Sequence, residues 1–218
     1  MSALNIKSAT AADYAAAIST LTKAFSSDPV ARWIFPDAEQ YAKHFPGFVA
    51  AFAGKALGHG SAHCSTDCAG VALWMPPGIY PDESAVVTLL QQSVYECDQD
   101  DVFGLFQRME KYHPAEPHWY LPMIGVGPAK QGKGYGSALL KHALVRCDSD
   151  NRLAYLESSN PQNIPLYERH GFEVLGTIQV GSSPPLFPML RKPRGAQWVN
   201  DLSENTLSVC TTAARIPE

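Results

Sequence analysis

The sequence of 218 residues lacks the features that mark membrane, secreted and nucleic-acid-binding proteins. No apolar run approaches the roughly 20 residues that cross a bilayer. The first seven residues have neither the charged head nor the apolar segment of a signal peptide. Charged residues make up only 17% of the chain and the formal net charge is −4, so no overall basic field attracts nucleic acid. These absences predict a cytoplasmic protein whose partners include neither a membrane nor a nucleic acid.

Cysteine is scarce and irregularly spaced. Five cysteines are an odd number, and a chain of this length can form a stable core without disulfide bonds. We therefore expect reduced thiols. His59, His63, Cys64 and Cys68 are residue types that bind zinc. However, His63 and Cys64 are adjacent, and neighbours on a strand point to opposite faces. The sequence therefore predicts no metal site.

The length and the 45% apolar content predict one globular domain with a substantial core. We place this domain at residues 1–194. Residues 195–218 are polar and aperiodic apart from Trp198 and Val199, which indicates a C-terminal arm or tail. Such an arm could pack on a second copy of the chain and form a homodimer.

Hydrophobic periodicity predicts an α/β protein. Helices are expected at 10–27, 38–57 with a break or kink at Pro46, 84–95, 101–111, 135–147 and 164–169. Strands are expected at 61–65, 69–75, 118–126, 153–156, 172–180 and 186–190. Pro122 and Gly125 interrupt the strand at 118–126, and such residues predict a bulge or an opening in a sheet.

The most informative segment, 126–136, lies between a predicted strand and a predicted helix. Gly132, Gly134 and Gly136 alternate with other residues there. A glycine-rich turn that enters a helix presents unpaired N–H groups at the positive end of the helix dipole. The spacing fits neither the Rossmann nor the Walker pattern. The segment predicts a cradle for a diphosphate, and a turn that binds nothing is the alternative.

At this point the sequence resembles a known family. The run from Gln131 to Gly136 is similar to the Q/R-x-x-G-x-G/A motif of the GNAT superfamily of N-acetyltransferases. The likeness extends over about residues 5–193, and flanking residues bring it closest to puromycin N-acetyltransferase-like members. The segments that carry it most clearly are 28–37, 118–121, 156–159 and 163–172.

The resemblance implies a GNAT fold, in which a mixed central sheet with flanking helices is splayed at its fourth and fifth strands. Acetyl-CoA would lie in the gap between them. The residues that correspond to its binding site are Ile124, Gly125, Val126, Gln131, Gly132, Lys133, Gly134, Tyr135, Gly136, Ser137, Asn163 and Tyr167.

The resemblance also implies an enzyme that transfers an acetyl group directly from acetyl-CoA to a primary amine of a small molecule, within a ternary complex. An alkylamine with a pKa of about 10.4 is almost fully protonated at pH 7, so such an enzyme needs a base. By resemblance, Glu157 is the base and Tyr167 is the acid that protonates the departing thiolate. The backbone N–H of Ile124 would donate a hydrogen bond to the thioester oxygen and stabilise the negative charge that develops on it.

For the acceptor site we single out Trp33, Tyr80 and His118, although aromatic residues pack in cores more often than they touch a substrate. Two other functions remain open. One is a non-catalytic acyl-CoA-binding or regulatory module, which the presence of both Glu157 and Tyr167 disfavours. The other is a nucleotide-binding α/β protein, which the glycine spacing disfavours.

Overall fold

A computed structural model describes residues 4–195, so the predicted arm at 195–218 lies outside the described residues except for Gly195. The strands are β1 Ile6–Ser8, β2 Ala62–Ser65, β3 Gly70–Met75, β4 His118–Val126, β5 Leu153–Ser158, β6 Glu173–Val174 and β7 Phe187–Arg191. The helices are α1 Tyr14–Ala24, α2 Pro29–Ile34, α3 Ala38–Ala53, α4 Lys55–Gly58, α5 Glu83–Ser93, α6 Glu96–Glu110, α7 Tyr135–Ser149 and α8 Ile164–Arg169.

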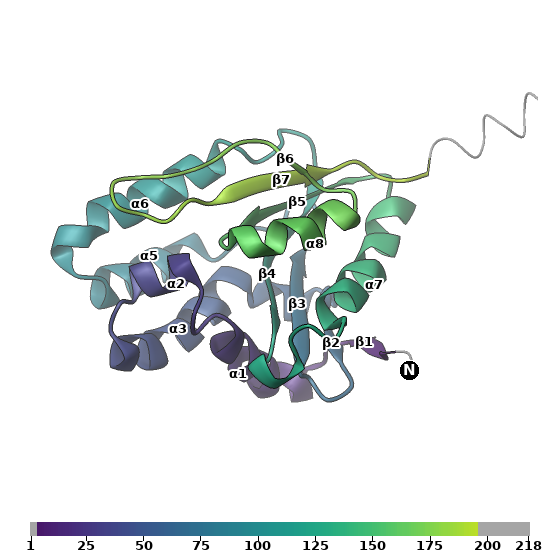
Figure 1. Ribbon diagram of the computed structural model, residues 1–218, viewed down its shortest axis with the longest axis horizontal. Helices are drawn as coiled ribbons and strands as arrows, with labels where there is room; N and C mark the ends of the chain where they lie inside the picture. Colours follow the sequence, from purple (N-terminus) through teal and green to yellow (C-terminus); the bar gives the residue numbers. More distant parts are fainter. Residues whose placement is uncertain (1–3, 196–218) are drawn as a thin grey trace, which may run out of the picture.

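The strands form one mixed sheet in the order β1-β2-β3-β4-β5-β7-β6. Every neighbouring pair is antiparallel except β4 and β5, which run parallel. The helical segment α7 connects β4 to β5, as a parallel pair requires. This sheet confirms the predicted α/β class (Figure 1).

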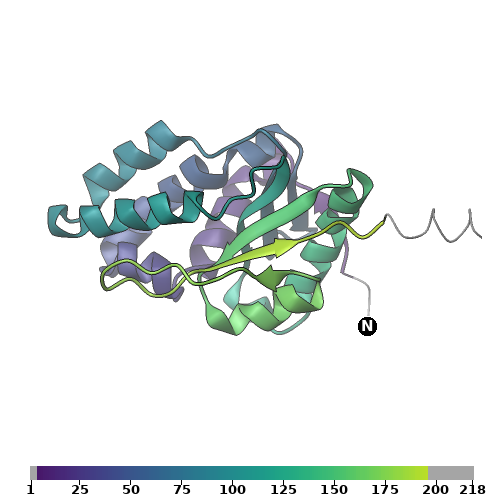
Figure 2. The same cartoon turned by 90° about the horizontal axis from the view of Figure 1, so that it is seen from above.

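Helices cover both faces of the sheet, so the fold has three layers (Figures 1 and 2). Helices α1–α6 pack on one face, and α7 and α8 pack on the other. β3 supplies both cores because its side chains alternate: Val71 and Leu73 join the first core, whereas Ala72 and Trp74 join the second. Within residues 4–195, no helix combines the length and the apolar character needed to cross a membrane.

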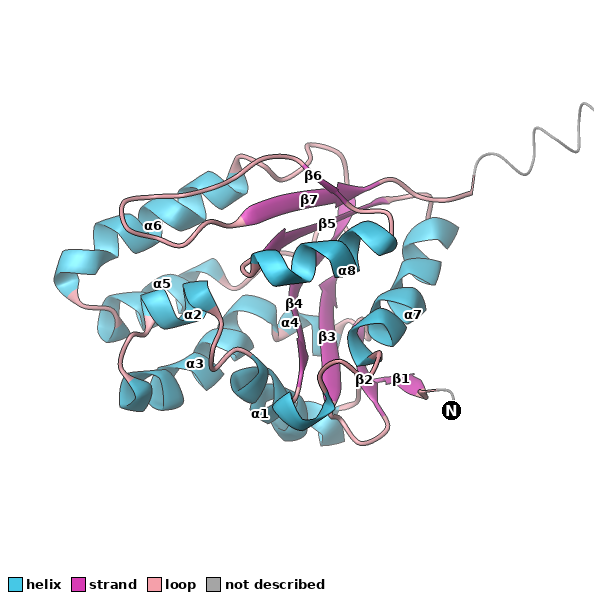
Figure 3. Ribbon diagram, in the orientation of Figure 1, coloured by secondary structure: helices cyan, strands magenta, loops and turns pink. Residues whose placement is uncertain are grey.

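The N-terminal half, which is mostly helical (Figure 3), differs from the sequence prediction in detail. β1, α2 and α4 are too short for periodicity to reveal. α2 begins where the Asp28 side chain accepts hydrogen bonds from two backbone amides, and Pro29 fills the first helical position. α3 is one continuous helix to Ala53 with Pro46 inside it, because its stripe of buried aromatic residues holds it against the core.

The strand predicted at 172–180 is wrong in its length. Only Glu173–Val174 is a strand, and Ile178 forms a single isolated bridge with Leu186. Leu175 donates its N–H to the Pro188 carbonyl at 2.8 Å. Pro188 has no N–H that could donate a hydrogen bond back to this segment. The pairing of β6 with β7 therefore cannot continue in its regular pattern.

Candidate active site

The site begins where β4 separates from β5. The parallel ladder joins only His118–Tyr120 to Leu153–Tyr155, although β4 continues to Val126. On its other side β4 pairs with β3 almost throughout, and the register moves from Leu73↔Met123 to Met75↔Tyr120. Between these two pairs β4 advances by three residues and β3 by only two. β4 therefore has a β-bulge around Pro122. The predicted opening between strands four and five is confirmed.

A cavity of about 630 Å³ occupies this opening. Its wall includes the segment of β4 from Tyr120 to Val126, residues of the glycine-rich turn, and side chains of β5 and α8. Helix α1 packs closely behind β4, since a Cβ atom at Gly125 would lie 2.7 Å from the Cβ atom of Ala24. The cavity thus connects the turn before α7 with the end of β5.

The glycine-rich turn leaves the first amides of α7 unpaired. Gly132 has a φ of +71° and Gly134 a φ of +86°, a region that L-residues with a side chain rarely adopt. Gly134 is the N-cap of α7 and offers no side chain to the helix amides. The N–H groups of the first helical turn therefore have neither an intrahelical acceptor nor a capping side chain.

Side chains of the turn hold its backbone in place. Gln131 Nε2 donates to the Val126 carbonyl at 3.1 Å, and Lys133 Nζ donates to the Ala129 carbonyl at 2.9 Å. The Oγ atom of Ser137 lies 2.9 Å from His170 Nε2. Of these, Gln131 and Ser137 line the cavity, whereas Lys133 does not.

Tyr167 lies on α8, lines the cavity and is only 6% exposed. Burial, and then the negative charge of Asp28, raise the pKa of its hydroxyl, so this hydroxyl remains protonated at neutral pH. Asp28 is itself buried, and its pKa is raised for that reason. Its carboxylate accepts the Ser159 hydroxyl at 2.5 Å and thereby links α2 to the segment after β5. Sequence reasoning did not single out Asp28, although an Asp-Pro pair is typical of a helix start and could have marked it.

Glu157 lies on β5 on the same face as Tyr155, and its side chain is 3% exposed. His113 Nε2 lies 3.2 Å from its Oε1 atom. Burial first, and then the Glu157 carboxylate, raise the pKa values of Tyr120 and Tyr155. Sequence reasoning missed His113, because its segment, 111–117, has no periodic pattern that would place it beside β5.

The three residues predicted for the acceptor site lie outside the cavity wall. Trp33 donates its indole N–H to Ser182 Oγ at 3.2 Å, and Tyr80 is 61% exposed. His118 lies next to His113, on the side away from the cavity. The phenylalanine side chains in the wall come from α3, α6 and the end of α1, namely Phe25, Phe45, Phe48, Phe52 and Phe106. Three tyrosines, Tyr120, Tyr135 and Tyr167, also line it.

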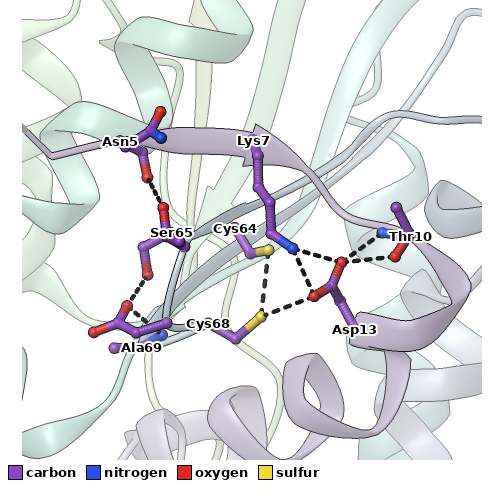
Figure 4. Close-up of polar contacts among 10 residues, drawn as sticks. Asn5, Lys7, Thr10, Asp13, Cys64, Ser65, Cys68 and Ala69 are labelled. Atoms are coloured by element: carbon purple, nitrogen blue, oxygen red, sulfur yellow. Dashed lines mark hydrogen bonds and ion pairs between the residues drawn. The ribbon is translucent and has the colours of Figure 1, made fainter.

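A second polar cluster lies near the edge of the sheet formed by β1 and β2 (Figure 4). Cys64 Sγ is 3.4 Å from Cys68 Sγ, which is 3.6 Å from Asp13 Oδ1, and these three potential ligand atoms lie within 4.8 Å of one another. The Lys7 ammonium contacts the Asp13 carboxylate at 2.8 Å. Burial raises the pKa of Cys64 to about 12, so its thiol is protonated. His63 turns to the opposite face and packs on His142.

Comparison with known proteins agrees with this geometry. Residues 16–172 match the acetyltransferase (GNAT) family. The chain is 30% identical over 200 residues to an uncharacterized N-acetyltransferase of Schizosaccharomyces pombe, which covers 84% of this chain and 81% of that protein. A shorter match, 38% identical over 63 residues, relates 25% of this chain to 21% of the mycothiol acetyltransferase of Mycolicibacterium gilvum.

Solved structures share the fold. A Corynebacterium glutamicum protein described as histone acetyltransferase HPA2 and related acetyltransferase is 26% identical, with a TM-score of 0.62 over 88% of this chain and 97% of that one. The arylalkylamine N-acetyltransferase 2 of Aedes aegypti is 12% identical, with a TM-score of 0.64 over 88% of this chain and 100% of that one. The chain therefore belongs to the GNAT family and is an acyl-CoA-dependent N-acetyltransferase.

Proposed function

We propose that this protein transfers an acetyl group from acetyl-CoA directly to a primary amine of a small molecule, within a ternary complex. The observation that carries the proposal is the continuity of one cavity. The same cavity is lined by the unpaired amides before α7, by the diverging part of β4, and by Glu157 and Tyr167. A thioester and an amine that meet there would both lie near a carboxylate and a phenol.

In this proposal the diphosphate of acetyl-CoA accepts hydrogen bonds from the amides between Gln131 and Ser137. Its pantetheine arm lies along β4 at Ile124, Gly125 and Val126, where β5 leaves backbone groups unpaired, with Asn163 on the other side. All of these segments line the cavity. A bulge followed by an unpaired strand is what an extended pantetheine chain needs, because its amides can replace the missing strand.

The charged residues in the cavity wall support one binding site for the phosphate groups and another for the amine. The wall contains four charged residues among those described: the basic residues Lys130 and Arg169, and the acidic residues Asp28 and Glu157. Lys130 belongs to the turn before α7, where phosphate groups would lie. Asp28 and Glu157 are buried carboxyl groups, which favour an ammonium group before reaction.

The chemistry then requires three proton transfers. Glu157 takes a proton from the ammonium, directly or through a water molecule, and the free amine attacks the thioester carbon. The Ile124 N–H stabilises the negative oxygen of the tetrahedral intermediate. As the C–S bond breaks, Tyr167 gives its proton to the sulfur, and the proton that the amide nitrogen then loses returns to the Tyr167 phenolate, directly or through a water molecule. The raised pKa of Tyr167 suits a donor that must be protonated at pH 7.

The aromatic wall favours an amine with an apolar body. Phe48 and Phe52 stack at 5.2 Å between ring centroids, and Phe52 meets Tyr120 edge to face at 6.4 Å. Because Tyr120 also neighbours Glu157, the rings continue up to the proposed base. Solved structures of the same fold include proteins named for arylalkylamines and for polyamines. We expect an arylalkylamine to be a better acceptor than a polyamine here.

The test is a coupled pair of measurements on the full chain. Release of free thiol from acetyl-CoA is followed over a panel with arylalkylamines, polyamines, a lysine-containing peptide and a tertiary amine as blank, while calorimetry measures coenzyme A binding. Thiol release with a small primary amine supports the proposal. Binding without release for any member would instead support a non-catalytic acyl-CoA-binding module, and release only with the peptide would contradict the small-molecule acceptor.

A further inference from the structure

A line of hydrogen-bonding groups leads from Glu157 toward the surface. His113 Nε2 lies 3.2 Å from Glu157 Oε1, and His113 Nδ1 lies 3.2 Å from His118 Nε2. His118 Nδ1 in turn lies 2.8 Å from the carbonyl oxygen of Glu116, an exposed residue. The exposed fraction rises along this line from 3% for the Glu157 side chain to 24% for the His113 side chain.

The end of this line determines which nitrogen atoms carry hydrogen. A carbonyl oxygen only accepts hydrogen bonds, so His118 Nδ1 must carry the hydrogen that it donates to Glu116. The other nitrogen of a neutral His118 is then an acceptor, which requires the hydrogen of His113 to be on Nδ1. Burial is the main cause that lowers the pKa of His118, which favours its neutral form.

The same argument leaves His113 Nε2 without a hydrogen, 3.2 Å from Glu157 Oε1. Among the described residues, Glu157 Oε1 is a buried oxygen with no hydrogen-bond partner, so no other group already occupies it. The hydroxyls of Tyr120 and Tyr155 also neighbour this carboxylate, but they already carry protons, so His113 Nε2 is the neighbouring group outside the cavity wall that can take one. The two hydrogen bonds beyond His113 Nε2 are oriented to move such a proton outward.

We propose that His113 and His118 form a relay that carries the proton taken by Glu157 out of the cavity, an inference that depends on the proposed function. The O–H bond of Glu157 breaks as a bond to His113 Nε2 forms, and the Nδ1 proton of His113 passes to His118 Nε2. His118, then an imidazolium, releases its Nδ1 proton to buffer. Exchange of the two partly exposed rings with solvent restores the first tautomer of each.

The surroundings of the relay hold the two rings in place. The His113 ring packs against Tyr120 at 4.7 Å and Tyr155 at 4.4 Å between ring centroids. The ionisable groups that face the relay are these two tyrosines on β4 and β5, Glu157 on β5, and Tyr112 and Glu116 from the segment that contains His113. Burial raises the pKa of both β-strand tyrosines, so neither competes for the proton near neutral pH.

The first test reads the tautomers directly in the protein without substrate. Nitrogen-15 NMR of the imidazole rings should show the hydrogen of neutral His118 and of neutral His113 on Nδ1. An Nε2–H tautomer at His118 would overturn the relay, whatever the activity of the chain. This measurement therefore separates failure of the relay from failure of the proposed acetyl transfer.

The second test is kinetic and uses His118→Gln, because His113 is packed between tyrosine rings and its substitution carries a greater risk of misfolding. In dilute buffer, kcat should fall about tenfold while KM for acetyl-CoA stays unchanged. Rising concentrations of a tertiary-amine buffer, which has no N–H to acetylate, should restore kcat because the buffer removes the proton.

Two controls complete the kinetic test. His59→Gln removes an exposed histidine outside the cavity and should behave as the wild type. Glu157→Gln should lose activity that no buffer concentration restores, because it lacks the group that first takes the proton. A wild-type kcat for His118→Gln in dilute buffer, or a loss that buffer does not reverse, would overturn the relay.

Discussion

The two ends of the cavity are built in different ways. The end proposed for coenzyme A consists of backbone: the part of β4 that does not pair with β5 and the amides of one turn, both within residues 121–137. The end proposed for the acceptor consists of side chains from α1, α2, α3, α6 and β5, which are far apart in the sequence. One end can therefore be recognised in a short motif, whereas the other exists only after the chain has folded.

This difference has a functional consequence. Backbone amides bind any diphosphate with the correct geometry, so substitutions of side chains at that end change affinity only through the conformation of the turn. The acceptor end depends on the identity of each side chain, because buried carboxylates and aromatic rings select charge and shape. We expect mutations at the two ends to separate into effects on coenzyme binding and effects on turnover.

The largest effect is expected for Glu157→Gln. The amide cannot take a proton, so kcat should fall at least about 100-fold, and the rise of kcat with pH that reports the base should disappear. Coenzyme A affinity should remain within about twofold, because the cradle is unaffected. Steady-state rates over a range of pH and calorimetry check both parts. Glu168→Gln, an exposed substitution on α8, is the matched control.

The next effect concerns Tyr167→Phe. Loss of the hydroxyl leaves the thiolate without its proposed acid, and we expect kcat to fall about 10- to 100-fold with KM for acetyl-CoA nearly constant. Tyr95→Phe removes the hydroxyl of a 51% exposed tyrosine and serves as the control. Turnover of Tyr167→Phe within about threefold of the wild type would remove Tyr167 as the acid.

The cradle is tested by a pair of glycine substitutions with the same backbone cost. Gly134 and Gly60 both have positive φ angles, +86° and +65°, and a Cβ atom meets no neighbour within 4 Å at either site. Each change to Ala should cost about 1 kcal/mol in unfolding free energy. Only Gly134→Ala should weaken coenzyme A binding, by about tenfold, because it alone alters the turn. Equal affinities of the two variants would contradict the cradle.

The division between the backbone end and the side-chain end of the cavity also determines how much of the site could be predicted from the sequence. Pro122 and Gly125 marked the strand that opens, and the spacing of Gly132 and Gly134 marked the turn, because both signals come from local backbone requirements. The segment containing His113 could not be placed, since its position beside Glu157 depends on how α6 leads into β4. Periodicity also missed β1 and α2, of three and six residues. α8 is as short as α2, but Gly171 marks its end in the sequence.

The smallest effect concerns a residue outside both ends. Burial lowers the pKa of His63 to about 4, so the unfolded chain binds a proton more readily than the folded chain. The free energy of unfolding should therefore decrease as pH falls from about 6.5 to 4, and His63→Gln should flatten this decrease by about 1–3 kcal/mol. Chemical denaturation at several pH values checks it. His59→Gln, which removes an exposed imidazole, should leave the slope unchanged.

The most direct test of the account is a crystal structure of the protein with coenzyme A. We predict that the pantetheine arm lies between β4 and β5 beside Ile124 and Val126, with the diphosphate within hydrogen-bond distance of the amides from Gly132 to Ser137. Coenzyme A bound elsewhere, or β4 and β5 hydrogen-bonded to each other beyond Tyr120 in the complex, would contradict it.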